Sequence, residues 1–143
     1  MKEQLLAVIR KDSIRKNKKN GTKEISLDSL RISSYDEIQK KIEQKVGERP
    51  ALSSDLPKGV WSEQALKILE ERYLRKDTLG QINETPDDLI WRVAFEIASA
   101  EVQWGGTKKE VLARAKDFYN LMISRKFLPN SPTLMNAGTG NKA

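Results

Sequence analysis

Apolar residues recur at helical spacing along the second half of the chain, and polar residues suited to helix ends precede each run. After Ser62, a suitable N-cap, the residues Leu66, Leu69 and Tyr73 lie three or four positions apart. This spacing predicts a helix over about residues 63–75.

The clearest helix start is the sequence Thr85–Asp88. It offers a hydroxyl N-cap, a proline at the first helical position, where no N–H is needed, and two carboxylates at the positive end of the helix dipole. The apolar face that follows consists of Leu89, Ile90, Val93, Ala94, Ile97, Ala98 and Val102. The pair Gly105 and Gly106 then ends a helix of about four turns.

A third helix is predicted from Thr107 onward, because Thr107 and Glu110 form a capping box. Its core side consists of Val111, Leu112, Ala115, Phe118, Tyr119 and Met122. Arg125 and Lys126 suit the negative end of this helix. Residues 129–140 then contain two prolines and two glycines, and we expect a loop there that contacts another group.

The first half of the chain is more polar. Ser34 and Glu37 offer a capping box, and a thin apolar stripe after them predicts a helix near residues 35–46. Residues 47–60 hold two prolines and two glycines, which is typical of a linker. Residues 10–24 are almost wholly polar and cannot bury enough surface to offset the entropy of ordering.

These elements predict an all-α fold, with about three core helices plus an N-terminal helix. We divide the chain into a basic flexible arm (1–33), a short helix with its linker (34–60), a helical domain (61–128) and a Pro/Gly-rich loop segment (129–143).

Composition limits the chemistry that this chain can carry. Its 143 residues include no cysteine and no histidine. Their absence excludes disulfides, thiolate or imidazole metal sites, cysteine nucleophiles and Ser–His–Asp triads within this sequence. The net charge is +6, and residues 1–23 supply all of it with eight bases and two acids. The positive charge therefore belongs to the arm.

The sequence holds no run of about 18 apolar residues that would span a membrane. Its start, MKEQLLAVIRKD, lacks the long apolar region and the cleavage site of a signal peptide. We expect a cytoplasmic protein with no membrane partner.

Three phrases in residues 61–143 resemble the N-terminal all-helical domain of the ribonucleotide reductase large subunit. They are ALKILEERYLRKD at 65–77, the Glu84-Thr85-Pro86 start with Arg92-Val93-Ala94 after it, and FLPNSPTLMNAG at 127–138. The third phrase is the most specific, and all three follow the family's order and spacing. The amino-acid sequence of residues 72–77 is most similar to that of the adenosylcobalamin-dependent members.

The resemblance implies a role for the third phrase. In the family it leads out of the helical domain into a catalytic barrel, and its serine, Ser131 here, helps to hold the substrate phosphate. We predict Ser131 as a substrate-binding residue, with Asn130, Pro132 and Thr133 as its immediate setting. A hydroxyl and neighbouring backbone N–H groups on a proline-restrained loop can donate to phosphate oxygens. We expect no catalytic, cofactor-binding or metal-binding residue in this chain.

The resemblance also implies the chemistry of a complete reductase. There a thiyl radical abstracts the ribose 3′ hydrogen, the 2′ hydroxyl is lost and a cysteine pair supplies the reducing equivalents. The sequence ends at Ala143, before the family's first redox cysteine, so we expect the remaining catalytic part of the reductase as a partner. A split gene and a truncated remnant both fit this expectation.

Adenosylcobalamin is the cofactor that the resemblance implies for the complete enzyme, and we expect none to be bound by this chain alone. A ribonucleotide substrate and a thioredoxin-type reductant are the further expected partners, with the reductant acting through the remaining part.

Ordinary structural roles compete with these functional ones. By chemistry alone, Ser131 is more often a turn hydroxyl that bonds its own backbone, and only the resemblance favours substrate contact. We expect structural ion pairs, or contacts with the remaining part, for Arg72 and Arg92. Helix capping explains three carboxylates better than a metal or acid–base cluster does: Glu84, Asp87 and Asp88. Core or boundary packing is expected for the aromatic residues Trp61, Tyr73, Trp91, Trp104 and Tyr119.

The basic arm supports an alternative of another class, a free-standing basic helical module that binds nucleic acid. Its cations would neutralise phosphates without sequence preference. The arm has no aromatic residue among its bases on which a nucleobase would stack. We therefore favour a solvated tail and expect no DNA partner.

Overall fold

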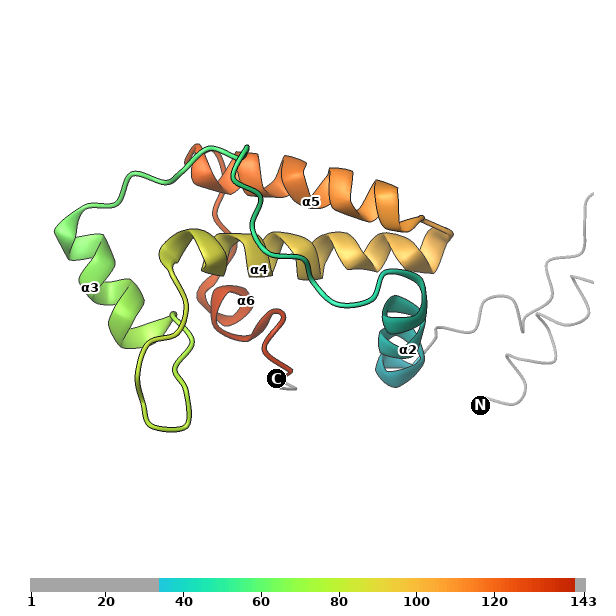
Figure 1. Ribbon diagram of the computed structural model, residues 1–143, viewed down its shortest axis with the longest axis horizontal. Coiled ribbons are helices and arrows are strands. Elements are labelled where there is room, and N and C mark those ends of the chain that lie inside the picture. Colours follow the sequence, from blue (N-terminus) through green and yellow to red (C-terminus); the bar gives the residue numbers. More distant parts are fainter. Residues whose placement is uncertain (1–33, 141–143) are drawn as a thin grey trace, which may run out of the picture. The chain divides into compact units, whose positions relative to one another are not determined.

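The computed structural model describes residues 34–140 and contains helices joined by loops (Figure 1). In chain order the elements are α2 (Tyr35–Lys45), α3 (Glu63–Arg72), α4 (Pro86–Ser99), the 3-10 helix η2 (Ala100–Trp104), α5 (Lys108–Ile123) and α6 (Ser131–Asn136). Over residues 34–140 the only β pairing is an isolated antiparallel bridge between Lys76 and Ile82. The predicted all-α class is confirmed. The predicted arm at 1–33 and residues 141–143 lie outside the described part.

Helices α4 and α5 run side by side in opposite directions and form the centre of the fold (Figure 1). Helix α4 buries nine of its fourteen residues, as expected for a central helix. Helix α5 buries one face, which consists of Val111, Ala115, Tyr119 and Met122. The edge of the Tyr119 ring meets Trp91 of α4 at a centroid distance of 6.1 Å, a favourable aromatic geometry.

The helix starts follow the capping signals of the sequence. Capping boxes are present at Ser34, Thr85 and Thr107, each with the acidic residue three positions later. Ser62 caps α3 by accepting from the backbone N–H of Ala65 at 3.2 Å. These four predicted starts are confirmed.

Two helix ends differ from the prediction. Helix α3 ends at Arg72, earlier than expected, and the N–H of Arg75 bonds the Glu84 carboxylate at 3.0 Å instead of a helical carbonyl. After Ser99 the predicted second helix tightens into η2, and Gly105 ends it in the left-handed region with φ 89°.

The segment between α2 and α3, predicted as a linker, lies against the core. Leu52 and Leu56 pack on the buried cluster. Two core aromatic residues also hold its backbone: Trp91 Nε1 donates to the carbonyl of Pro50 and the Tyr119 hydroxyl donates to that of Pro57, both at 2.8 Å. Figure 1 shows this segment running past α4 and α5 on its way to α3.

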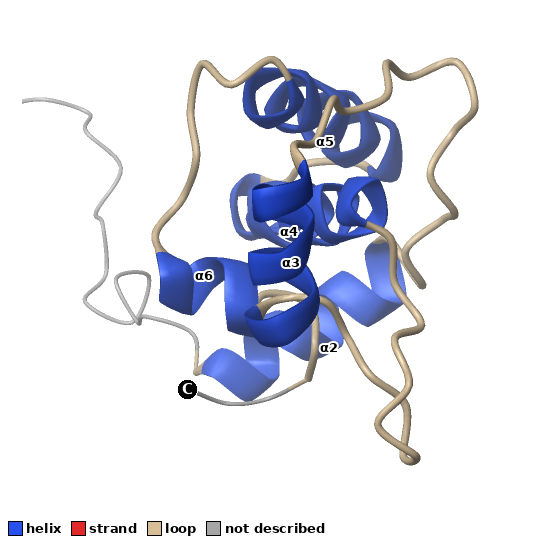
Figure 2. Cartoon of the chain, turned by 90° about the vertical axis from the view of Figure 1, so that its left-hand side faces the viewer, coloured by secondary structure: helices blue, strands red, loops and turns tan. Residues whose placement is uncertain are grey.

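The loop predicted for residues 129–140 is wrong over its middle part, where α6 forms a helix separate from α5 (Figure 2). Asn130 is its N-cap, and its side-chain oxygen accepts from the N–H of Thr133 at 3.2 Å. Pro132 lies in the first turn, where its missing N–H costs no hydrogen bond. Leu134 is buried and holds the short helix to the core. The prolines that rule out continuing α5 therefore permit a new helix.

Two further expectations fail at the surface. Trp104 was expected to pack, yet it is 77% exposed. The Arg125 guanidinium donates to the backbone carbonyl of Val60 instead of to the end of α5. None of the helices in the described part is both long and apolar enough to cross a membrane.

Candidate functional site

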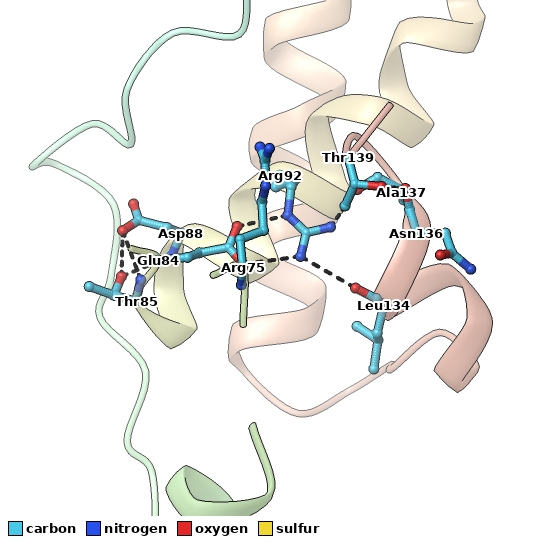
Figure 3. A network of polar contacts seen from close by, with 9 residues as sticks. All are labelled: Arg75, Glu84, Thr85, Asp88, Arg92, Leu134, Asn136, Ala137 and Thr139. Atoms are coloured by element: carbon cyan, nitrogen blue, oxygen red, sulfur yellow. Dashed lines mark hydrogen bonds and ion pairs between the residues drawn. The ribbon is translucent and has the colours of Figure 1, made fainter. Parts of the chain in front are cut away.

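A buried ion pair between Arg92 and Glu84 lies beside the segment that the sequence analysis assigned to substrate (Figure 3). Arg92 is 0% exposed and Glu84 is 9% exposed. Arg92 Nε donates to Glu84 Oε1 at 2.7 Å, and Arg92 Nη2 donates to Glu84 Oε2 at 3.1 Å. This two-point geometry is the arrangement in which a guanidinium binds a carboxylate most strongly.

The same guanidinium holds α6. Its Nη1 donates to the carbonyl of Ala137, and its Nη2 donates to the carbonyl of Leu134 at 3.4 Å (Figure 3). The last carbonyls of a helix have no partner within the helix, and a cation beside them is favourable. Arg92 therefore ties the end of α6 to α4 while its charge is balanced by Glu84.

Gly138 permits the close approach of α6 to Arg92. Its φ is 69°, in the left-handed region that favours glycine. A Cβ at this position would lie 2.9 Å from Arg92 Cγ, so a side chain would push the two segments apart.

The four predicted substrate residues lie together at the start of α6. Asn130 caps the helix, and its Oδ1 also accepts from the Thr133 hydroxyl at 2.7 Å. Pro132 stands in the first turn. The side chain of Ser131 does not bond its own backbone, as a turn hydroxyl would; its Oγ lies 2.8 Å from the hydroxyl of Tyr73, the C-cap residue of α3.

A hollow of about 810 Å³ lies on another side of α6. Pro132 and Thr133 line it together with Asp36 of α2 and Glu96 of α4, whereas Ser131 does not.

A smaller hollow of about 430 Å³ has Arg49 and Arg75 in its wall together with the carboxylates of Glu84 and Asp88. Burial lowers the pKa of Arg49 from its ordinary value, and the positive charge of Arg92 lowers it further. The charges of Glu84 and Asp88 act in the opposite direction and raise this pKa.

The site offers hydrogen-bond donors and fixed backbone geometry, and its chemistry is that of binding. Within residues 34–140, no three acidic side chains gather closely enough to hold a metal ion. Ser131 is exposed at the start of α6.

Two of the three carboxylates expected to be helix caps have other partners. Asp88 does cap α4, through the capping box with Thr85. Asp87 instead accepts from the N–H of Gly59 at 3.2 Å and from Trp61 Nε1 at 2.9 Å. Glu84 forms the ion pair with Arg92.

The expectation of a structural ion pair at Arg92 is confirmed, but its link to α6 was not predicted. One signal in the sequence points to a buried partner. Arg92 interrupts the apolar run Ile90-Trp91-Arg92-Val93-Ala94, and a charge among buried apolar side chains needs a partner of opposite sign.

A family model of the ribonucleotide reductase all-alpha domain matches residues 61–142, which is more than half of the chain. The chain belongs to this family. Residues 34–60, with α2, lie outside the match.

Several curated reductases are similar to part of the chain. A vitamin B12-dependent ribonucleoside-diphosphate reductase of Mycobacterium tuberculosis is 42% identical over 77 residues, which cover 52% of this chain and 10% of that protein. The enzyme of the same name from Thermoplasma acidophilum is 31% identical, with 52% of this chain and 17% of that protein covered. The ribonucleoside-diphosphate reductase large chain of Neurospora crassa is 44% identical over 73 residues, 51% of this chain and 7% of that protein.

The chain thus spans less than a fifth of these relatives. Membership of the all-alpha domain family confirms the resemblance found in the sequence. Within this domain, the Arg92–Glu84 pair, α6 and the Tyr73–Ser131 contact all lie inside the matched residues.

Proposed function

We propose that this chain works as the N-terminal helical part of a ribonucleotide reductase, where it supplies architecture and one contact to the substrate phosphate. The observation that carries the proposal is the exposed hydroxyl of Ser131, at the start of a helix whose other end is fixed by buried Arg92. The family assignment favours this role over a free-standing nucleic-acid-binding module.

The substrate that we propose is a ribonucleoside diphosphate, because the similar reductases carry that substrate in their names. Ser131 donates one charge-assisted hydrogen bond to a phosphate oxygen, and Asn130, Pro132 and Thr133 fix the turn that carries it. Thr133 and Asn130 are bonded to each other, so their role is to hold the turn.

The redox groups come from elsewhere, because this sequence has no cysteine. We propose that the remaining catalytic part of the reductase supplies them and receives electrons from a thioredoxin-type reductant. The names of two similar reductases support adenosylcobalamin as the cofactor of the complete enzyme. The sequence has no histidine that could serve as a cobalt ligand, and the larger hollow of residues 34–140 has the carboxylates of Asp36 and Glu96 in its wall. We therefore place it in the remaining part.

The test is to combine this chain with the remaining catalytic part of the reductase. A ribonucleoside diphosphate, adenosylcobalamin and a thioredoxin system complete the assay, and deoxyribonucleotide formation is the measurement. We expect activity only when both parts are present. Binding of duplex DNA with a steep salt dependence, together with no reductase activity on mixing, would instead establish the nucleic-acid-binding module.

The substitution Ser131→Ala tests the phosphate contact in the same assay. We expect the KM for the diphosphate to rise by about five- to thirtyfold, since one hydrogen bond to a charged group contributes about 1–2 kcal/mol. An unchanged KM and rate would remove Ser131 from the substrate site.

A further inference from the structure

The hydroxyl groups of Tyr73 and Ser131 form a side-chain contact between residues 58 positions apart in the sequence. Their oxygens are 2.8 Å apart, a normal distance between two hydroxyl groups. Tyr73 ends α3 and Ser131 begins α6, so the contact joins two helices at their ends.

Tyr73 is held firmly on its own side of this contact. Its ring is partly buried and packs against the hydrophobic core. Its backbone N–H bonds the carbonyl of Leu69 at 2.9 Å as the C-cap of α3. The packing of the ring and the backbone bond therefore hold the phenol oxygen in place beside Ser131 Oγ.

The other contacts that hold α6 do not involve the Ser131 hydroxyl. Asn130 fixes the backbone of the first turn, and Arg92 fixes the carbonyls at the far end. In the part of the chain that the structure describes, Tyr73 is the residue bonded to Ser131 Oγ. The direction of the Ser131 O–H bond therefore depends on Tyr73.

The hydroxyl pair of Tyr73 and Ser131 keeps one proton that can bind an anion. Two hydroxyl groups carry two protons, and the bond between them uses one. One O–H remains to donate outward. When Tyr73 donates to Ser131 Oγ, the proton of Ser131 is free to donate to a phosphate oxygen, and the incoming bond strengthens that donation.

We propose that Tyr73 is a positioning residue for substrate binding, which donates to Ser131 Oγ and so directs the Ser131 proton at the substrate phosphate. This inference rests on the proposed function, because it assumes that Ser131 meets the phosphate. Tyr73 acts through Ser131 and needs no contact with the substrate.

The experiment uses the complete reductase, with this chain combined with its catalytic part and with CDP as the substrate probe. Four forms are compared: Tyr73→Phe, Ser131→Ala, the double variant and the unchanged protein. Phenylalanine keeps the ring in the core and removes only the hydroxyl. Tyr119→Phe is the matched control, because it removes a hydroxyl that bonds the Pro57 carbonyl and lies on α5.

We expect Tyr73→Phe to raise the KM for CDP by about three- to tenfold with little change in kcat, as for the loss of one neutral hydrogen bond. In the Ser131→Ala background the same substitution should change the KM by less than about twofold, because Tyr73 then has no hydroxyl to direct. Tyr119→Phe should leave the KM unchanged.

Each other outcome has a distinct meaning. If Ser131→Ala raises the KM and Tyr73→Phe does not, the positioning role is refuted and the phosphate contact stands. If neither substitution changes the KM, the phosphate contact itself fails and the positioning role falls with it. If Tyr73→Phe changes the KM equally with and without Ser131, Tyr73 acts by another route and the proposal is overturned.

Discussion

Substituting Glu84 by glutamine tests whether the ion pair with Arg92 holds this domain together. Glutamine has the shape of glutamate but no charge, so Arg92 would remain 0% exposed without a compensating carboxylate. The substitution also replaces one of the two carboxylate oxygens that accept from Arg92 by an NH2 group, which is a donor facing the guanidinium. With the amide nitrogen at the Oε1 position, Arg92 Nε would lose its charge-assisted bond; with the nitrogen at the Oε2 position, Arg92 Nη2 and the N–H of Arg75 would both lose theirs.

The expected magnitude follows from the burial of the pair. Removing one partner of a buried ion pair destabilises proteins by about 3–5 kcal/mol, because the other charge stays uncompensated. For a domain of this size, a loss of 1 kcal/mol lowers the melting temperature by about 4–8 °C. We therefore expect Glu84→Gln to lower Tm by more than about 12 °C.

The assay is unfolding of this chain in urea and by heat, followed by helical circular dichroism. Glu101→Gln is the matched control, since Glu101 pairs with Arg114 at 3.4 Å and both side chains are well exposed, at 41% and 51%. Such a surface pair contributes at most about 1 kcal/mol. A Glu84→Gln variant that loses no more stability than Glu101→Gln would refute the reasoning.

Two further predictions concern α6 and Tyr119. Gly138→Ala and Gly140→Ala both place alanine at a positive φ, but of these two glycines only Gly138 lies against Arg92. We expect each variant to lose about 1–2 kcal/mol of unfolding free energy from backbone strain, and Gly138→Ala to lose measurably more in urea unfolding. Equal losses would contradict the close packing of Gly138 on Arg92. Burial, followed by the charges of Asp87 and Asp88, raises the pKa of Tyr119 to about 12 from its ordinary value of 10.0. Because the folded state holds this proton more tightly, its contribution to stability is complete below pH 10 and is lost as the pH rises toward about 12. Tyr119→Phe should remove that part of the alkaline loss, and an unchanged difference in stability between pH 9 and pH 11.5 would contradict the assignment.

The helices could be predicted from the sequence because the signals at their starts are local. A capping box needs only a hydroxyl and a carboxylate three residues apart, and those at Thr85 and Thr107 act wherever the chain lies in space. Helix α6 has the same kind of signal, Asn130 followed by Pro132 in the first turn. We predicted a loop there because two prolines and two glycines lie within residues 129–140.

The site was predicted less completely, because its contacts join residues far apart in the sequence. The family resemblance pointed to Ser131 and its neighbours. Nothing local links Ser131 to Tyr73, or Arg92 to the carbonyls of Leu134 and Ala137. Those contacts follow from how α3, α4 and α6 pack, and packing is decided by the whole core. The charge of Arg92 within an apolar run does predict a buried partner of opposite sign, but it does not say which residue that partner is.

The two ends of α6 are held by hydrogen bonds of different strength. We therefore expect the contacts at one end to determine the stability of the domain and the contact at the other end to affect substrate binding. At its C-terminal end, the Arg92 that bonds the helix carbonyls is fully buried and paired with Glu84, so loss of this ion pair should lower the stability of the domain by several kcal/mol. At its start, the Tyr73–Ser131 bond is exposed and joins neutral groups, so its loss should leave the fold nearly intact. Glu84→Gln should therefore change Tm strongly, whereas Tyr73→Phe should leave Tm within a few degrees of the unchanged protein. If Tyr73→Phe lowered Tm as far as Glu84→Gln does, the hydroxyl pair would be part of the structural clamp, and the assignment of Tyr73 to substrate positioning would be wrong.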